Sequence, residues 1–193
     1  MPANADDEII EKWYCGRMEL VLPSTKYKDS FIEAVREYKA DASHITTRRY
    51  SELSISELES DFETFLEKEL SHSHGENLPE GFVSQTEYWL VEGGKYIGHA
   101  VVRHRLNDHL LAIGGHIGYN IRPSQRGEGY GEKILALALP KARELGIERV
   151  LLTCDETNVA SRKIIEKNGG VLENKVPNPE TGVAKLRFWI DLP

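Results

Sequence analysis

Residues 126–131, which read Arg-Gly-Glu-Gly-Tyr-Gly, combine one cationic side chain with three glycines. Glycine lets backbone N–H groups come close to an anion, and the positive end of a following helix attracts negative charge. A short apolar strand pattern over residues 114–123 precedes this hexapeptide, and a helical composition over residues 132–145 follows it. The order of strand, glycine-rich turn and helix therefore predicts a phosphate-binding site.

Two common phosphate-binding motifs do not fit these residues. A P-loop places Ser or Thr after its lysine to bind magnesium, whereas Ile134 follows Lys133 here. A Rossmann turn has two residues between its second and third glycines, whereas only Tyr130 separates Gly129 from Gly131. The pattern that remains is Arg-x-x-Gly-x-Gly.

A second element follows the first along the chain. Residues 148–155 are β-branched and leucine-rich, which is typical of a buried strand. Asn158 then suits a helix N-cap, and the pair Gly169-Gly170 suits the end of that helix. The chain thus contains two successive strand–helix units.

Together, Arg-x-x-Gly-x-Gly and the later Asn-x-x-Ser resemble the GCN5-related N-acetyltransferase (GNAT) family over roughly residues 86–190. The resemblance implies an α/β fold, with a mixed, mostly antiparallel sheet flanked by helices on both faces. It also implies acetyl-coenzyme A as the cosubstrate and no metal. We expect a single domain over residues 1–193, with acceptor-side helices in 1–85 and the cofactor-binding core in 86–193. Residues 114–119 read Gly-Gly-His-Ile-Gly-Tyr and resemble a group of predicted acetyltransferases without a named substrate.

The resemblance also assigns roles to individual residues. In the family, two central strands separate, and the pantetheine arm of coenzyme A lies between them against an exposed strand edge. One N–H of that edge polarises the thioester carbonyl, and such oxyanion stabilisation is among the larger catalytic effects. The residues that match the cofactor site are Tyr119, Asn120, Ile121, Arg126, Gly127, Glu128, Gly129, Tyr130, Gly131, Asn158 and Ser161.

The acceptor amine must lose a proton, and His116 is the first candidate for the base. An imidazole titrates at about 6.5 and can accept a proton at neutral pH. Strand alternation places His116 on the same face as Gly118 and Asn120. A histidine on a buried strand also suits a structural hydrogen bond, and Asp155 and Glu156, at the end of the next strand, are the alternative bases.

The departing thiolate must gain a proton or other stabilisation. The family often uses a tyrosine in the helix of the second element, but Ile165 occupies that position. Ser161 is the first substitute, while Cys154 and Tyr130 are further alternatives. A thiol pKa of about 8.5 also lets the thiolate leave with help from water and the helix dipole.

Composition and charge limit the classes of function. The net charge of −7 argues against a nucleic acid or an anionic membrane as the main partner. No apolar run reaches the roughly 18 residues of a membrane span, and Cys15 and Cys154 lack the spacing of a disulfide framework or zinc site. His72 and His74 lack a third metal ligand nearby. We therefore expect a cytoplasmic protein, with a homodimer compatible with the sequence.

These patterns predict an N-acetyltransferase that moves an acetyl group to a primary amine of a small molecule or peptide by direct attack. The acidic surface mildly favours a cationic acceptor. Two alternatives stay open: a non-catalytic coenzyme A-binding or metabolite-sensing module, and a transferase of a longer acyl group.

The first 85 residues predict one strand and two helices that begin with capping boxes. Residues 18–22 form the strand pattern. Ser30 with Glu33, and Ser54 with Glu57, have the spacing of capping boxes ahead of apolar residues at helical intervals. Turn residues then predict two hairpins, which are centred on residues 92–95 and 177–182.

Overall fold

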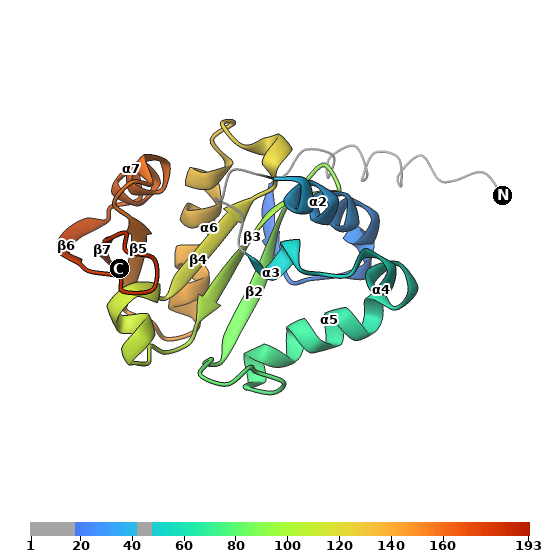
Figure 1. The fold of residues 1–193 in the computed structure, drawn as a ribbon, viewed down its shortest axis with the longest axis horizontal. Coiled ribbons are helices and arrows are strands. Elements are labelled where there is room, and N and C mark those ends of the chain that lie inside the picture. The colour runs from blue at the N-terminus through green and yellow to red at the C-terminus, as the bar shows by residue number, and fades with distance from the viewer. Residues whose placement is uncertain (1–17, 42–47) are drawn as a thin grey trace.

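A computed structural model describes residues 18–41 and 48–193 (Figure 1). It is a mixed α/β fold with two antiparallel sheets, which confirms the predicted fold class. The four-stranded sheet has the order β1-β2-β3-β4, and the three-stranded sheet has the order β5-β7-β6. The strands are β1 (Glu19–Val21), β2 (Gln85–Glu92), β3 (Lys95–Arg103), β4 (Ile117–Ile121), β5 (Arg149–Asp155), β6 (Val171–Val176) and β7 (Lys185–Asp191).

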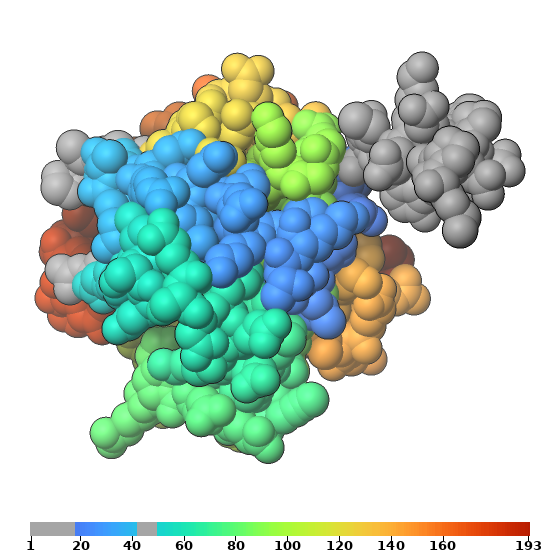
Figure 2. All heavy atoms as spheres, turned by 90° about the vertical axis from the view of Figure 1, so that its right-hand side faces the viewer, coloured from blue at the N-terminus to red at the C-terminus, as the bar shows by residue number. Residues whose placement is uncertain are grey.

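Helices cover both faces of the larger sheet. Within the described residues, four N-terminal helices lie on one face, and Figure 2 shows them covering that side of the molecule. They are α2 (Lys28–Ala40), α3 (Arg48–Ser51), α4 (Ile55–Ser60) and α5 (Phe62–Ser71). The long helix α6 (Tyr130–Glu144) packs on the opposite face, and α7 (Val159–Lys167) lies beside α6 and β5 (Figure 1).

Strand alternation divides the core into two halves. On β2, Trp89 faces the N-terminal helices and stacks on Phe31 with ring centroids 4.5 Å apart. The next residue, Leu90, faces the core under α6, together with Ala100 and Ile134. Because successive side chains of a strand point to opposite faces, one sheet holds both layers of helices.

The boundaries of the N-terminal helices differ from the predicted ones. Helix α2 begins at Lys28, so Ser30 lies inside it, and its hydroxyl accepts a hydrogen bond from Tyr96 N at 3.0 Å instead of capping the helix. Ser54 does cap α4. The second predicted helix is interrupted at Asp61, whose carboxylate accepts from Thr64 N and starts α5.

The strand–helix units follow the predicted order. Gly129 is the N-cap of α6 with a φ of +79°, a left-handed conformation that favours glycine. Asn158 caps α7 by accepting a hydrogen bond from Ser161 N at 3.0 Å. Both strands of each predicted hairpin form, at β2–β3 and β6–β7. The turn before β4 is a π-helical segment, Leu110–Gly114, which the sequence did not predict.

Within residues 18–41 and 48–193, no helix has both the length and the apolar character of a membrane span. The same part of the chain brings no three His, Cys, Asp or Glu side chains together as a metal site, and this includes His72 and His74. Cys15 lies outside the described residues.

Candidate functional site

The two sheets meet at a junction between β4 and β5. His116 N donates to Leu151 O at 2.7 Å, and Leu151 N donates back to His116 Nδ1 at 2.9 Å. Gly115 permits this approach, because its φ is +72° and a Cβ there would lie 2.6 Å from Leu151 O. Beyond the junction, β4 and β5 are edge strands of different sheets. The strand edges therefore separate where β4 begins.

His116 is held by this junction on the backbone of β5. Burial and the nearby positive charge of Arg103 lower the pKa of His116 to about 4. The ring is therefore neutral at pH 7, and its Nδ1 already accepts a hydrogen bond from Leu151 N. This geometry favours a structural role for His116 over the predicted role of general base.

One cavity, of about 320 Å³, lies between β4, the glycine-rich loop and α7. We refer to it as the coenzyme-side cavity. Most of the residues predicted to bind the cofactor line it, whereas Glu128 is exposed and lies outside the lining and Gly129 acts as the helix cap. The predicted residues in the lining are Tyr119, Asn120, Ile121, Arg126, Gly127, Tyr130, Gly131, Asn158 and Ser161.

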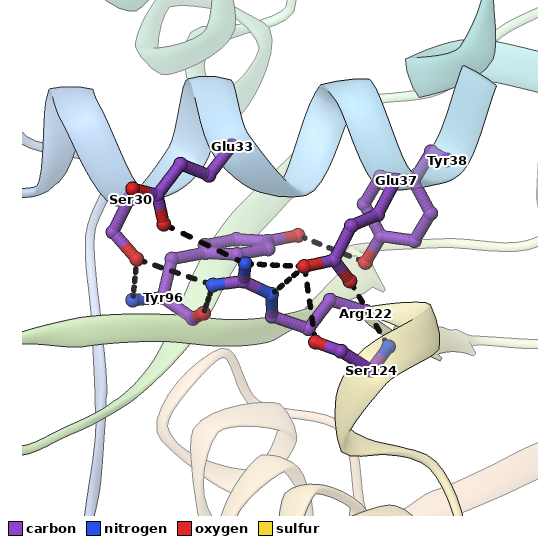
Figure 3. A network of polar contacts seen from close by, with 7 residues as sticks. All are labelled: Ser30, Glu33, Glu37, Tyr38, Tyr96, Arg122 and Ser124. Atoms are coloured by element: carbon purple, nitrogen blue, oxygen red, sulfur yellow. Dashed lines mark hydrogen bonds and ion pairs between the residues drawn. The ribbon is translucent and has the colours of Figure 1, made fainter. Parts of the chain in front are cut away.

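Helix α2 braces the loop that forms this cavity. Arg126 Nε donates to Ile121 O at 3.1 Å, and its Nη1 pairs with Asp41 at 2.7 Å. Glu37 pairs with the buried guanidinium of Arg122 at 2.5 Å and accepts a hydrogen bond from Ser124 N at 3.0 Å (Figure 3). Glu37 of α2 and Asp41, which directly follows α2, thus fix both ends of the short segment that leads into the glycine-rich loop.

Glu37 is ionised in this network. Partial burial acts to raise its pKa, but hydrogen bonds from Arg122 and Ser124 outweigh that effect and lower it. Tyr96 shares the network through its carbonyl oxygen, which accepts from Arg122 Nη1 at 3.1 Å. The Tyr96 hydroxyl lies 3.4 Å from Tyr38 Oη (Figure 3). It also lies 3.0 Å from His99 Nδ1, so the polar contacts continue along β3.

A second cavity, of about 520 Å³, opens on the other side of the β4 edge, and we call it the acceptor-side cavity. Its polar lining comes from β2, β3, β5 and β7, namely from Gln85, His99, Arg103, Thr153, Asp155 and Lys185. Three further lining residues, Tyr119, Asn158 and Ser161, belong to both cavities. The two cavities therefore adjoin at these three residues.

A pair of hydroxyl groups lies where the cavities adjoin. Tyr119 Oη and Ser161 Oγ are 3.1 Å apart. Burial raises the pKa of Tyr119 to about 12, so its hydroxyl keeps its proton at neutral pH. The Asn158 cap fixes the first turn of α7 and with it the backbone of Ser161. This arrangement can deliver a proton to an atom between the two cavities.

A family model described as an acetyltransferase (GNAT) domain matches residues 17–171. The chain belongs to the GNAT acetyltransferase family. No curated protein matches the chain significantly. The family match covers both strand–helix units and helices α2 to α5.

Solved structures of other acetyltransferases share the fold of this GNAT protein. RimL, a ribosomal L7/L12 α-N-protein acetyltransferase in complex with coenzyme A, matches with a TM-score of 0.62 at 19% identity, over 91% of this chain and 94% of that chain. The microcin C7 self-immunity acetyltransferase MccE, with acetyl-coenzyme A and AMP, has a TM-score of 0.62 at 16% identity, over 91% and 92%. A SpeG spermidine N-acetyltransferase chimera from Vibrio cholerae and hSSAT has a TM-score of 0.60 at 15% identity, over 90% and 95%.

The remaining predicted residues of this GNAT protein have distinct surroundings. Asp155 lines the acceptor-side cavity, and its carboxylate pairs with Lys185 at 2.8 Å. Cys154 also lines that cavity, but burial raises its pKa to about 11, so it stays a thiol. Ile165 is fully buried in the core under α6 and takes no part in the polar site.

Sequence reasoning missed most of the acceptor-side cavity. His99 and Arg103 point to the same sheet face, because they are four residues apart on β3, and both line the cavity. That alternation was visible in the sequence. What brings Lys185 of β7 next to Asp155 of β5 is strand pairing between distant segments, and no local pattern signals it.

Proposed function

We propose that this GNAT protein transfers an acetyl group from acetyl-coenzyme A to a primary amine of a small molecule or peptide, by direct attack. One observation carries the proposal: the two cavities adjoin at Tyr119, Asn158 and Ser161. Two substrates held on opposite sides of that point would have their reacting groups together. Holding reactants in this way removes much of the entropic cost of a reaction between two molecules.

The coenzyme-side cavity suits the donor. Its glycine-rich loop and the N-terminus of α6 offer backbone N–H groups and a positive helix end to a pyrophosphate. Arg126 adds a charge that can pair with phosphate. The open edge of β4 at Tyr119, Asn120 and Ile121 suits the pantetheine arm. RimL and MccE, which share the fold, are described with coenzyme A and acetyl-coenzyme A, respectively.

The acceptor nitrogen, which attacks as the neutral amine, must lose one proton as the amide forms. We assign the removal of this proton to Asp155, because its carboxylate lines the acceptor-side cavity and is held there by its ion pair with Lys185 at 2.8 Å. The amine nitrogen attacks the thioester carbon, an N–H of the β4 edge stabilises the oxyanion that forms, and Asp155 takes the N–H proton from the nitrogen of this intermediate. The carbon–sulfur bond breaks next, and the acetyl group stays on the amine.

The leaving thiolate takes its proton from Ser161. The Ser161 hydroxyl lies at the point where the cavities adjoin, and Tyr119 Oη, at 3.1 Å, can replace the proton that Ser161 gives up. This pair takes the role that the family often gives to the tyrosine at the position of Ile165. Tyr119 regains its proton from solvent and Asp155 releases its proton to solvent, so that one proton moves overall from the amine nitrogen to the thiolate sulfur.

The acceptors of the structural neighbours differ in size and charge. RimL is described as a ribosomal-protein acetyltransferase, and SpeG as a spermidine N-acetyltransferase. Both descriptions support an amine acceptor for the present chain, and neither selects one.

The test is release of free coenzyme A from acetyl-coenzyme A across a panel of small amines and short peptides. We expect turnover with at least one amine, and loss of most of that turnover in Asp155→Asn at unchanged acetyl-coenzyme A affinity. Thr157→Ala, a change at an exposed residue of the same turn, is the control. Binding of acetyl-coenzyme A without turnover on any amine would favour the sensing module instead.

A longer acyl donor is tested in the same assay with propionyl- and butyryl-coenzyme A. We expect acetyl-coenzyme A to give the highest kcat/KM. A higher value with butyryl-coenzyme A would show that the acyl group is longer.

A further inference from the structure

A third and smaller cavity adjoins the acceptor-side cavity. Its volume is about 150 Å³, and we call it the side pocket. The linings of the side pocket and the acceptor-side cavity share Phe82, Gln85 and Arg103. The other residues that line the side pocket are Gly81, Val83, His109 and Leu110. An acceptor held in the larger cavity can therefore extend into the side pocket.

Apolar side chains from two segments form part of the wall of the side pocket. Phe82 and Val83 come from the segment before β2, and Leu110 comes from the π-helical turn before β4. Val83 is buried, whereas Phe82 is 56% exposed. The Phe82 ring thus lies at the mouth of the cavity with much of its apolar surface in water. An apolar group of a ligand that covered this surface would gain binding free energy.

The backbone on both sides of Phe82 is held by hydrogen bonds. Asn107 Nδ2 donates to Gly81 O at 2.9 Å, and His104 N donates to Ser84 O at 2.9 Å. These bonds tie the segment before β2 to the residues that follow β3. Because the segment is fixed before a ligand arrives, little backbone entropy should be lost when the ligand binds.

The side pocket lies at a distance from the point at which the reaction is proposed to occur. Arg103, which lines the side pocket, donates its backbone N–H to His116 O at 2.8 Å. Tyr119, where the coenzyme-side and acceptor-side cavities adjoin, follows three residues later. A strand rises roughly 3.3 Å per residue, so the two places are roughly 10 Å apart along β4.

The size and lining of the side pocket suit an aromatic ring. An apolar cavity of roughly 150 Å³ is large enough to bind benzene. The lining here also includes the polar side chains of Gln85 and His109. An aromatic ring can lie against polar groups through its negative face or its positive edge, whereas an alkyl group has neither.

We propose that the side pocket binds an aromatic ring of the acceptor. The acceptor is then a primary amine with an aromatic group roughly 10 Å from its nitrogen, either in an arylalkylamine or on a side chain of a peptide. Phe82 is the residue that determines this specificity. The inference rests on the proposed function, and it adds an apolar group to the cationic amine that the net charge favours.

The test compares amines that differ only in the ring. Phenylalkylamines with two, four or six methylene groups are each compared with the alkylamine of the same chain length without the ring. We expect the ring to raise kcat/KM at least about tenfold in the longer compounds. The gain should be much smaller in phenethylamine, whose ring is too close to the nitrogen to span roughly 10 Å. A peptide arm compares Ala-Phe-Ala and Ala-Ala-Phe with Ala-Ala-Ala, and the arm with the larger gain identifies the source of the ring.

The variant Phe82→Ala should abolish the gain by raising the KM of the ring-bearing acceptor, with the acetyl-coenzyme A KM unchanged. Phe82→Leu, which keeps part of the apolar surface, should retain part of the gain. Leu111→Ala is the matched control, because Leu111 is 45% exposed on the adjacent π-helical turn and lies outside the linings of both cavities. Equal kcat/KM with and without the ring, in both arms of the wild-type experiment, would overturn the inference even if Phe82→Ala failed to fold.

Failure of the proposed function gives a different result. If no amine turns over, the same pairs are titrated calorimetrically into the protein saturated with coenzyme A. About tenfold tighter binding of the ring-bearing members, lost in Phe82→Ala and kept in Leu111→Ala, would support the inference without catalysis. Equal binding of both members of each pair, or binding of neither member, would overturn it.

Discussion

The two cavities that adjoin at Ser161 are built in different ways. Two short stretches of chain, residues 119–131 and 158–164, supply the whole lining of the coenzyme-side cavity. Strands that are far apart in sequence, β2, β3, β5 and β7, supply most of the polar groups of the acceptor-side cavity. We infer that a local motif serves the donor common to the family, while long-range packing sets the acceptor. Substitutions in the two cavities should therefore change different kinetic constants.

The largest expected effect lies at the shared boundary. Ser161→Ala removes the proposed proton donor to the thiolate, and general acid catalysis is typically worth at least about a hundredfold. We expect kcat to fall by about that factor while the KM values of both substrates change little. Steady-state kinetics with both substrates measures this.

An unchanged kcat in Ser161→Ala would remove Ser161 from the chemistry. Tyr119→Phe is a useful companion, because it keeps the ring and removes only the hydroxyl that lies 3.1 Å from Ser161 Oγ. It should lower kcat by a smaller factor than Ser161→Ala.

The next largest effect is expected from a substitution that tests whether α2 supports the coenzyme-side cavity. Glu37→Gln leaves the guanidinium of Arg122, whose side chain is 9% exposed, without its main carboxylate partner. Breaking a buried pair costs about 3–5 kcal/mol, but Glu33 remains 3.7 Å away and Glu37 is partly exposed, so we expect a loss of about 2 kcal/mol of unfolding free energy. Chemical denaturation measures this loss of unfolding free energy. Steady-state kinetics should also show a raised acetyl-coenzyme A KM.

The stability lost in Glu37→Gln should also depend on pH. The folded-state pKa of Glu37 is lowered, so its ionised carboxylate stabilises the protein at neutral pH, and this contribution disappears as pH falls through the folded pKa. The difference between wild type and variant should therefore shrink in acid. Glu59→Gln is the control, because its ion pair with Arg36 is about half exposed and should contribute less than about 1 kcal/mol.

A smaller effect should separate the two cavities most clearly. Arg126→Ala removes a cation from the coenzyme-side loop, and we expect the acetyl-coenzyme A KM to rise about tenfold, or about 1.4 kcal/mol, with no change in acceptor KM. Phe82→Ala should give the opposite pattern with a ring-bearing acceptor. If either variant changed both KM values equally, the division between the cavities would be lost.

The smallest effect concerns the junction of the two sheets. His116→Ala leaves Leu151 N without its acceptor, and loss of such a hydrogen bond costs about 1 kcal/mol at neutral pH. The pKa of His116 is lowered to about 4 in the folded protein, against about 6.5 when unfolded, so its contribution is full above about pH 6.5 and is lost as pH falls towards 4.

Thermal unfolding of wild type and His116→Ala at several pH values measures the contribution of His116 to stability. The stability difference should narrow between about pH 6.5 and pH 4. If His116→Ala instead lowered kcat about a hundredfold and left the stability unchanged, His116 would again be the candidate base.

The success of the sequence predictions also differs between the locally built coenzyme-side cavity and the acceptor-side cavity, which distant strands form. Residues 126–131 and Asn158 carried the family resemblance from which the fold was predicted. They also placed the glycine-rich loop and the start of α7, because glycine turns and helix caps are local features that neighbouring residues determine. His116 was read as a candidate base because its face could be deduced from alternation, but its bond to Leu151 depends on the junction of two sheets. The contact between Ser161 and Tyr119 likewise required the packing of α7 on β4.

The acceptor side was the least predictable part. Net charge suggested a cationic acceptor, whereas the lining of one cavity depends on which few side chains the strands bring together. Arg103 lies near Gly118 through the pairing of β3 with β4, and this pairing joins residues that are separated by the π-helical turn. A whole-chain charge therefore carries little information about a single cavity.

Initial-rate kinetics with acetyl-coenzyme A and the acceptor varied together would test the central claim most directly. If the two cavities hold both substrates at once and the acetyl group moves directly, double-reciprocal plots will intersect. Parallel lines would indicate that an acetylated enzyme forms and coenzyme A leaves before the amine binds, which would contradict direct transfer between the two cavities.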